Sequence, residues 1–155
     1  MKFRKAKKSD AQRLFEWRND PLTRASSLTT EPIVWSKHLE WLKKTLRNPE
    51  REILIAVNEG GSETGTVRFD KLQEDGSIEL SWTVAPEWRG KGVGKEIVTA
   101  ALALPFAVAK KVRARIKSDN VASQRIAQAV GFCFQSEHEG LGEWYLAVKT
   151  ERRKK

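Results

Sequence analysis

The central part of the chain alternates polar and apolar positions in the way that is typical of strands. Residues 64–70 alternate, with Val67 and Phe69 on one face of the predicted strand. The apolar, β-branched run at residues 52–58 predicts a strand before it, and residues 78–84 predict a strand after it. Because the turn sequences NEGG and DG separate these segments, we expect three strands joined by hairpins.

Helical signals dominate the first third of the chain. Ser9 and Gln12 have the spacing of a capping box, which predicts a helix that ends by Asp20-Pro21. A polar loop is expected at residues 21–34. Ser36 is expected to cap a second helix, which has leucines on one face and stops before an Asn-Pro pair.

The second half alternates helices and strands. One helix is expected to begin near Gly94 and to kink or end at Pro105, and another to run from about Asn120 to Gly131. The other expected strands are residues 3–6, residues 112–116, a strand opened by Gly131-Phe132, and residues 143–148. The resulting order, β-α-α-β-β-β-α-β-α-β-β, predicts an α/β fold: a mixed sheet with helices on both faces.

Length and composition predict one globular domain over residues 1–155. Of these 155 residues, 39% are hydrophobic and 32% are charged, and no apolar run approaches the roughly 20 residues of a membrane helix. The N-terminal MKFRKAKK has no apolar segment behind it, so neither a signal peptide nor a membrane partner is expected. The single cysteine, Cys133, fits a reducing compartment, and we expect a cytoplasmic protein.

The net charge of +9 is concentrated at the two ends of the chain. Residues 1–8 and 149–155 contain the whole excess, and residues 9–148 are formally neutral. Because a nucleic-acid groove needs a basic face rather than two basic ends, nucleic acid is not the expected partner. A solvated basic C-terminal tail is the simpler interpretation of residues 149–155, and RNA contact by the tails stays open as the alternative.

Residues 82–101, WTVAPEWRGKGVGKEIVTAA, place a glycine-rich turn between a strand and a helix. Unpaired amides and the helix dipole at such a helix start attract anions, and Arg89 and Lys91 add positive charge, so we expect a pyrophosphate here. A Walker loop needs GxxxxGK[ST], which is absent from the sequence. A dinucleotide-binding loop needs GxGxxG, whereas the glycines here are spaced two and two.

The segment RGKGVG resembles the (Q/R)xxGx(G/A) signature of the GCN5-related N-acetyltransferases (GNAT). The resemblance continues in Val84-Ala85-Pro86-Glu87 before the loop, in Asn120-Val121-Ala122-Ser123 and in Gly131-Phe132, which follow in that order. It implies the GNAT fold, with a splayed central sheet, and acetyl-CoA as the co-substrate without any metal. A homodimer is a further expectation that rests on the resemblance alone.

The resemblance also implies which residues hold acetyl-CoA. The strand before the loop would pair with the pantetheine arm through the residues Trp82, Thr83 and Val84. The loop would hold the pyrophosphate through the residues Arg89, Gly90, Lys91, Gly92, Val93 and Gly94. Asn120 would contact the pantetheine, and the alternative that it only caps its helix stays open.

The implied reaction is direct attack of an amine on the thioester. Many members of the superfamily protonate the leaving thiolate with a tyrosine, but Ala127 stands at that position and the single tyrosine, Tyr145, lies on the last strand. Ser123 is the candidate substitute, with a water as the alternative. Glu79 is the candidate general base, against the alternative of a solvent-facing strand carboxylate. His138 is expected to be an exposed residue without a role in the reaction.

The pattern WRND-P-x-x-R…H-x-x-W in the first third would determine the acceptor. It resembles ribosomal-protein N-terminal acetyltransferases, and more closely the acetyltransferases of nucleotide-linked amino sugars. By this resemblance Arg18, Arg24 and His38 would bind a nucleotide diphosphate, with Trp17, Trp35 or Trp41 stacking on a base or sugar. The alternative is a helix end with tryptophans of the core, which the helical spacing favours for Trp41. The predicted acceptor is therefore a nucleotide-linked amino sugar. The alternatives are a protein N-terminus, another small amine, or a silent acyl-CoA-binding module.

Overall fold

A seven-stranded sheet forms the centre of the computed structural model, which describes residues 1–107 and 110–147. The strand order is β1-β2-β3-β4-β5-β7-β6, and neighbours are antiparallel except β4 and β5. The strands are β1 (Lys2–Lys5), β2 (Arg51–Val57), β3 (Glu63–Lys71), β4 (Ile78–Val84), β5 (Val112–Lys117), β6 (Cys133–His138) and β7 (Leu141–Leu146).

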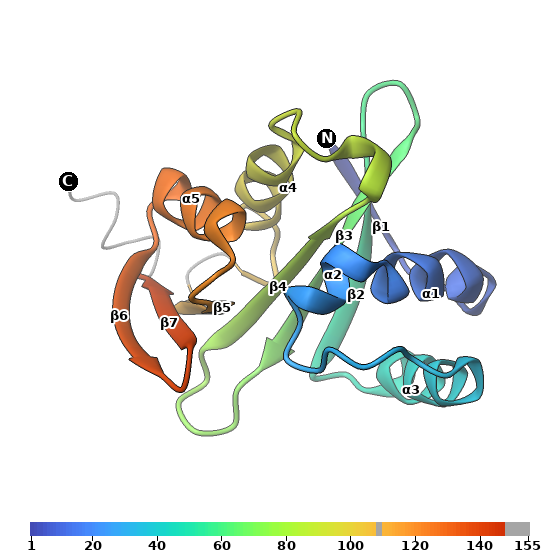
Figure 1. Cartoon of the computed structure of the whole chain (residues 1–155), viewed down its shortest axis with the longest axis horizontal. Coiled ribbons are helices and arrows are strands. Elements are labelled where there is room, and N and C mark those ends of the chain that lie inside the picture. Colours follow the sequence, from blue (N-terminus) through green and yellow to red (C-terminus); the bar gives the residue numbers. More distant parts are fainter. Residues whose placement is uncertain (108–109, 148–155) are drawn as a thin grey trace.

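Helices cover both faces of this sheet (Figure 1). On one face lie α1 (Ala11–Asn19), α2 (Pro21–Ala25) and α3 (Trp35–Arg47); on the other lie α4 (Val93–Ala101) and α5 (Val121–Val130). Two 3₁₀ turns, Lys8–Asp10 and Pro86–Trp88, precede α1 and the glycine-rich loop. The expected mixed α/β sheet and the order of its main elements are confirmed.

The consecutive apolar residues of β2 are buried on both faces of the sheet. Ile53 and Ile55 pack with α1 and α3, whereas Leu54 and Ala56 belong to the core under α4. Since successive side chains point to opposite faces, a strand covered on both faces must be apolar at every position. The sheet therefore separates two hydrophobic cores.

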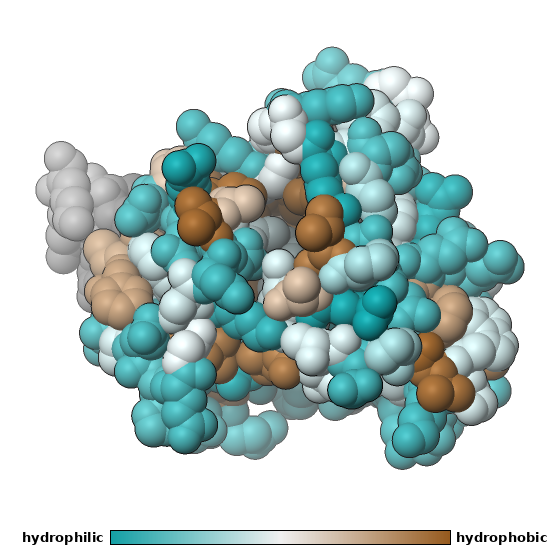
Figure 2. All heavy atoms as spheres, in the orientation of Figure 1, coloured by the Kyte–Doolittle hydropathy of each residue, from teal (hydrophilic) through white to brown (hydrophobic). Residues whose placement is uncertain are grey.

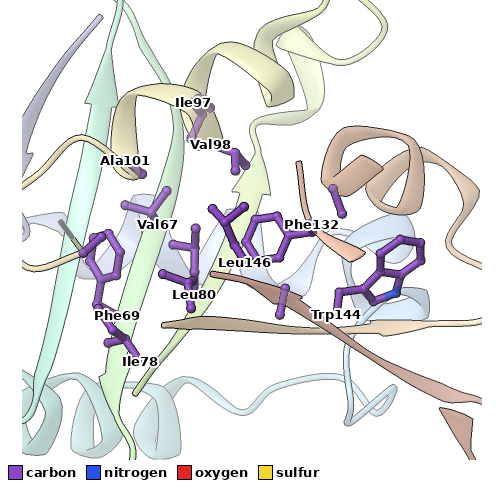
Figure 3. Packing of buried hydrophobic residues seen from close by; sticks show 14 of the residues in the cluster. Val67, Phe69, Ile78, Leu80, Ile97, Val98, Ala101, Phe132, Trp144 and Leu146 are labelled. Atoms are coloured by element: carbon purple, nitrogen blue, oxygen red, sulfur yellow. The ribbon is translucent and has the colours of Figure 1, made fainter. Parts of the chain in front are cut away.

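The larger core lies between the sheet and α4 (Figure 3). Ile97 and Val98 of α4 are completely buried over Val67 and Phe69 of β3. These two strand residues are the apolar set that the alternation in residues 64–70 predicts, and Arg68 between them faces the opposite side. The sheet face opposite α4 therefore receives the polar side chains of β3 and β4.

The structure corrects the expected loop at residues 21–34, because α2 forms within it. Asp20 accepts a hydrogen bond from the Thr23 amide at 3.2 Å, and Pro21 occupies the first helical position. The Asp-Pro pair thus ends α1 and starts a new helix. Helix α4 ends at Ala101, before Pro105.

Both predicted serine caps are wrong. Ser9 lies inside the first 3₁₀ turn, where Asp10 accepts from the Lys7 amide at 2.8 Å, and the residue before α3 is Val34 rather than Ser36. A helix can begin without a side-chain cap when its apolar face is buried, which explains why a capping pattern alone misplaced these starts.

Two expectations concern the C-terminal end of the chain. The last described strand is Leu141–Leu146 rather than residues 143–148. Val148 and the basic segment 149–155 lie outside the described residues. No helix in residues 1–107 or 110–147 combines the length and hydropathy needed to cross a membrane.

Asp10 joins the start of the first helix to the sheet. Arg4 of β1 donates to both carboxylate oxygens, at 2.8 and 2.9 Å, and this pairing lowers the pKa of Asp10. Arg4 also forms an ion pair with Glu63 of β3. Because the folded pKa is depressed, the contribution to stability is complete above the unfolded pKa of about 3.9 and is lost as the pH falls below it.

We therefore expect Asp10→Asn to lower the free energy of unfolding by about 1–3 kcal/mol at pH 7. The difference from the wild type should shrink as the pH falls below 4, where the native carboxylate also loses its charge. Urea unfolding at several pH values measures this, with the exposed Asp119→Asn as the matched control. A difference that is constant from pH 7 to pH 3 would contradict the assignment.

Candidate functional site

The central sheet splits between β4 and β5. These parallel strands pair only at Ile78–Val112 and Glu79–Arg113, whereas β3 and β4 pair along their whole length. From Leu80 to Val84, β4 therefore has one edge without a paired strand, and Figure 1 shows β4 leaning away from β5. Free backbone amides and carbonyls along such an edge can bind an extended ligand as a strand does. The predicted splay is present.

The glycine-rich loop lies between the open end of β4 and α4. Gly90 and Gly92 have φ values of +73° and +77°, a left-handed conformation that favours glycine, and an added Cβ at either would meet open space. Among the turn and cap hydrogen bonds of the described residues, no amide between Gly90 and Gly94 is a donor. Unpaired amides at the start of a helix are suited to bind an anion, and the pyrophosphate contact of this loop stays a prediction.

Gly94 brings α4, α5 and β4 into close contact. A Cβ at this position would lie 2.5 Å from Ile126 of α5 and 3.3 Å from Val84 of β4. This third glycine is therefore required by packing, whereas the first two are required by the shape of the loop. The loop is fixed relative to the split by this contact.

The residues present fit the pantetheine and pyrophosphate of acetyl-CoA. Besides the loop amides, the indole Nε1 of Trp82 is buried and has no hydrogen-bond partner within the described part of the chain. An unpartnered buried donor costs free energy, so an acceptor on a bound ligand would stabilise it. Trp82 lies on the split part of β4 and packs near Phe132, with ring centroids 6.4 Å apart.

Helix α2 lies beside the split and is tied to both of its sides. Arg89, at the start of the loop, donates to Asp20 at 2.5 Å and to Thr23 at 2.8 Å. Lys117, at the far end of β5, donates to the Ala25 carbonyl at 3.0 Å. The side chain of Arg89 thus anchors α2, and its predicted phosphate contact remains a prediction.

Asn120 caps α5. Its side chain accepts from the Ser123 amide at 3.1 Å, which is the alternative that the sequence left open, and its contact with pantetheine stays a prediction. The Ser123 hydroxyl has no hydrogen bond to another described residue. Ala127, one turn further along α5, is completely buried in the core and brings no polar group to the split.

Glu79 is buried and bound by two arginines. Its Oε1 accepts from Arg113 at 2.6 and 2.9 Å and from Arg115 at 2.7 Å, and its Oε2 accepts from Arg115 at 3.0 Å. Only 8% of the side chain is exposed. Because both carboxylate oxygens already accept hydrogen bonds from guanidinium groups, the geometry gives Glu79 the role of holding these arginines and does not support it as the general base. It is neither solvent-facing nor free.

A polar depression of about 470 Å³ surrounds Glu79 on the sheet face opposite α4. We call its charged floor the arginine basin, made of Arg51, Arg68, Arg113, Arg115, Asp70 and Glu79. Asp70 accepts from Arg51 at 2.7 Å and from Arg68 at 2.9 Å. The sequence did not single out Arg51, Arg113 or Arg115 as site residues, whereas Val67-Arg68-Phe69-Asp70 also resembles the nucleotide-amino-sugar acetyltransferases. The alternation in VRARIK indicates that Arg113 and Arg115 share one face of their strand. It does not indicate their partner, Glu79, which lies on another strand.

Arg18 lies on the ring of Trp41, with its guanidinium carbon 3.9 Å from the ring centroid. Its Nη1 is 2.9 Å from Nδ1 of His38, whose Nε2 lies 2.8 Å from the Ala11 carbonyl. Burial, together with the charges of Arg68 and Arg51, lowers the pKa of Arg18 to about 10. We call Arg18 and Trp41 the Arg18 platform.

The remaining residues predicted to bind the acceptor have different positions. His38 is completely buried, so the structure contradicts a direct contact with an acceptor; it positions Arg18 instead. Trp17 is buried in the core and offers no face for stacking, whereas Trp35 is 42% exposed. Arg24 donates to the carbonyls of Asn19 and Thr30, at 3.0 and 3.3 Å, and so holds the segment after α2.

The family follows from a comparison with known sequences. The sequence model of the acetyltransferase (GNAT) domain family matches residues 1–133. The chain belongs to this GNAT family. An uncharacterized Methanocaldococcus jannaschii protein, MJ1062, is 27% identical over 127 residues, which are 80% of this chain and 26% of that protein. The chain thus spans about a quarter of the length of that relative.

Solved structures show the same fold. A spermidine N-acetyltransferase of Vibrio cholerae with CoA and spermine superposes with a TM-score of 0.82, at 15% identity over 94% of each chain. YncA of Salmonella typhimurium, a putative acetyltransferase with acetyl-CoA, gives 0.75 at 24% identity, over 96% of this chain and 94% of that one. The family match confirms the predicted superfamily, and these structures show the predicted fold.

The glycine-rich loop of the GNAT domain can be tested directly. Gly92→Glu places a side chain and a negative charge in the amide site, and we expect acetyl-CoA binding to weaken at least about tenfold. Isothermal titration calorimetry measures the change.

Gly76→Glu is the matched control, because Gly76 also has a positive φ, +73°, and open space around it, but lies in the β3–β4 turn. Gly76→Glu therefore imposes the same kind of backbone strain as Gly92→Glu. If both variants lose binding equally, or if neither does, the loop is not the pyrophosphate site.

Proposed function

We propose that this GNAT domain transfers the acetyl group of acetyl-CoA to the primary amine of a nucleotide-linked amino sugar. The observation that carries the proposal is the positive charge on the sheet face opposite α4. The Arg18 platform and the arginine basin both lie there, against the carboxylates of Asp70 and Glu79. An acceptor with phosphate groups would be attracted to this face.

A polyamine acceptor fits this face poorly. Spermine, which is bound in the Vibrio cholerae structure, is a polycation, and basic side chains would repel it. A flat guanidinium on an indole ring instead suits stacking with a nucleobase. We therefore assign the base to the Arg18 platform, in which His38 holds Arg18, and Arg24 stays a proposed contact of the acceptor.

The split then brings the two substrates together. Acetyl-CoA would lie along the free edge of β4, its pantetheine at Trp82, Thr83 and Val84 and its pyrophosphate on the loop amides. The acceptor amine would enter from the opposite sheet face and attack the thioester carbonyl, which a backbone amide of β4 polarises. The nitrogen–carbon bond forms, the carbon–sulfur bond breaks, and the amine nitrogen loses a proton to a water. The thiolate takes a proton either from Ser123, which regains one from water, or directly from a water.

Turnover assays distinguish this proposal from its alternatives. Release of the free CoA thiol is measured with a UDP-linked amino sugar, spermidine and a peptide with a free N-terminus. We expect the amino sugar to give the highest kcat/KM, and unlinked amino sugar to be a poor acceptor. Preference for the peptide or spermidine would replace the proposed acceptor, and CoA binding without turnover on any amine would indicate a silent module.

A second test concerns Ser123. If its hydroxyl protonates the thiolate, Ser123→Ala should lower kcat about 10- to 100-fold and leave the KM for acetyl-CoA nearly unchanged. Ser136→Ala, on the exposed strand β6, is the control. Unchanged kinetics in both variants would assign the proton to water.

We also propose that the chain forms a homodimer along β6. This strand is the edge of the sheet, is exposed throughout, and carries Phe134, which is 53% exposed. An exposed edge with an apolar side chain favours pairing with another chain. The spermidine N-acetyltransferase of Vibrio cholerae, which has a similar fold, has a dodecameric structure.

A further inference from the structure

The arginine basin holds more positive charge than its carboxylates neutralise. Four arginines and Lys71 line the depression, against Glu50, Asp70 and Glu79, which leaves a formal excess of two positive charges. Lys71 and Glu50 form their own pair at 3.7 Å. The excess therefore lies on the arginines.

Like charges gathered in this way cost free energy. Arg68 and Arg51 lie close enough to Arg18 for their charges to contribute to the lowering of its pKa. A surface of long, solvated side chains would spread such charges apart, whereas here the two shared carboxylates hold them in place. An anionic ligand would remove the repulsion.

The carboxylates orient the guanidinium groups and leave donors available. Asp70 accepts hydrogen bonds from Nε of Arg51 and from Nε of Arg68. Within the described chain, the Nη atoms of these two arginines have no hydrogen-bond partner. Glu79 accepts hydrogen bonds from Nε and Nη2 of both Arg113 and Arg115. Fixed guanidinium groups with free N–H edges are well suited to bind phosphate oxygens in pairs.

The basin lies at the closed end of the split. Glu79 and Arg113 are the last paired residues of β4 and β5. Ser81 is the next residue of β4 on the same face, about 7 Å further along the strand. A ligand anchored at the basin can therefore extend along this face into the split, where the thioester would lie.

We propose that the arginine basin binds the diphosphate of the acceptor. This inference rests on the proposed function and changes one part of it, because the sequence analysis gave the diphosphate to Arg18, Arg24 and His38. The base occupies the Arg18 platform, the diphosphate occupies the basin, and the amine of the sugar reaches the split. Glu79 is a positioning residue that holds Arg113 and Arg115.

The experiment must exclude the CoA loop, which also binds a pyrophosphate. We therefore measure binding of UDP, inorganic pyrophosphate and uridine by calorimetry to protein saturated with CoA. UDP should bind, pyrophosphate should compete with it, and uridine should bind at least about tenfold more weakly than UDP. UDP affinity should also fall steeply with added salt.

The variants Arg68→Gln and Arg115→Gln should each weaken UDP binding about tenfold and leave CoA affinity unchanged. Arg47→Gln, an exposed arginine at the end of α3, is the matched control. Thermal unfolding identifies a variant that does not fold. The salt dependence and the UDP–uridine comparison in the wild type test the basin independently of the variants.

The outcomes separate the basin from the proposed function. Weaker UDP binding in both basin variants supports the basin even if no amino sugar is acetylated. If both variants acetylate a UDP-linked amino sugar with an unchanged KM for that sugar, the basin is not the diphosphate site, and the proposed function stands. If neither UDP nor pyrophosphate binds the CoA-saturated protein, the basin is not a diphosphate site.

Discussion

The site depends on one interruption in the sheet, the end of β4–β5 pairing after Glu79 and Arg113. Up to that pair the sheet is continuous, and beyond it β4 has a free edge. On one face, α4 packs on β3 and β4 and α5 packs on β5, and Gly94 allows the two helices to come into close contact. The space between the strands is what lets two ligands meet from opposite faces.

Each face of the split carries hydrogen-bond donors of a different kind. On the α4 face, the donors are backbone amides of a glycine-rich loop. On the opposite face the arginine basin provides charged donors held by Asp70 and Glu79. Figure 2 shows a surface that is mostly hydrophilic, with only separate hydrophobic patches. Electrostatic attraction is the basis of the recognition that we propose.

Local patterns predicted most of the fold and the loop, but not the partners of individual side chains. Alternation around Val67 and Phe69 gave the strand and its buried face, and RGKGVG gave the loop. The role of Glu79 depends on Arg113, which is 34 residues away in the sequence and adjacent in the sheet. Likewise, nothing near His38 indicates that Ala11 and Arg18 enclose it. Such pairings arise from strand order, which a residue pattern alone does not specify.

We propose that the two substrates bind on opposite faces of the split. The structure of a ternary complex with CoA and UDP tests it most directly. We predict the CoA pyrophosphate on the amides of Gly90–Gly94 and the UDP diphosphate within hydrogen-bonding distance of Arg68 and Arg115. UDP found only in the glycine-rich loop, or bound away from the arginine basin, would contradict the account.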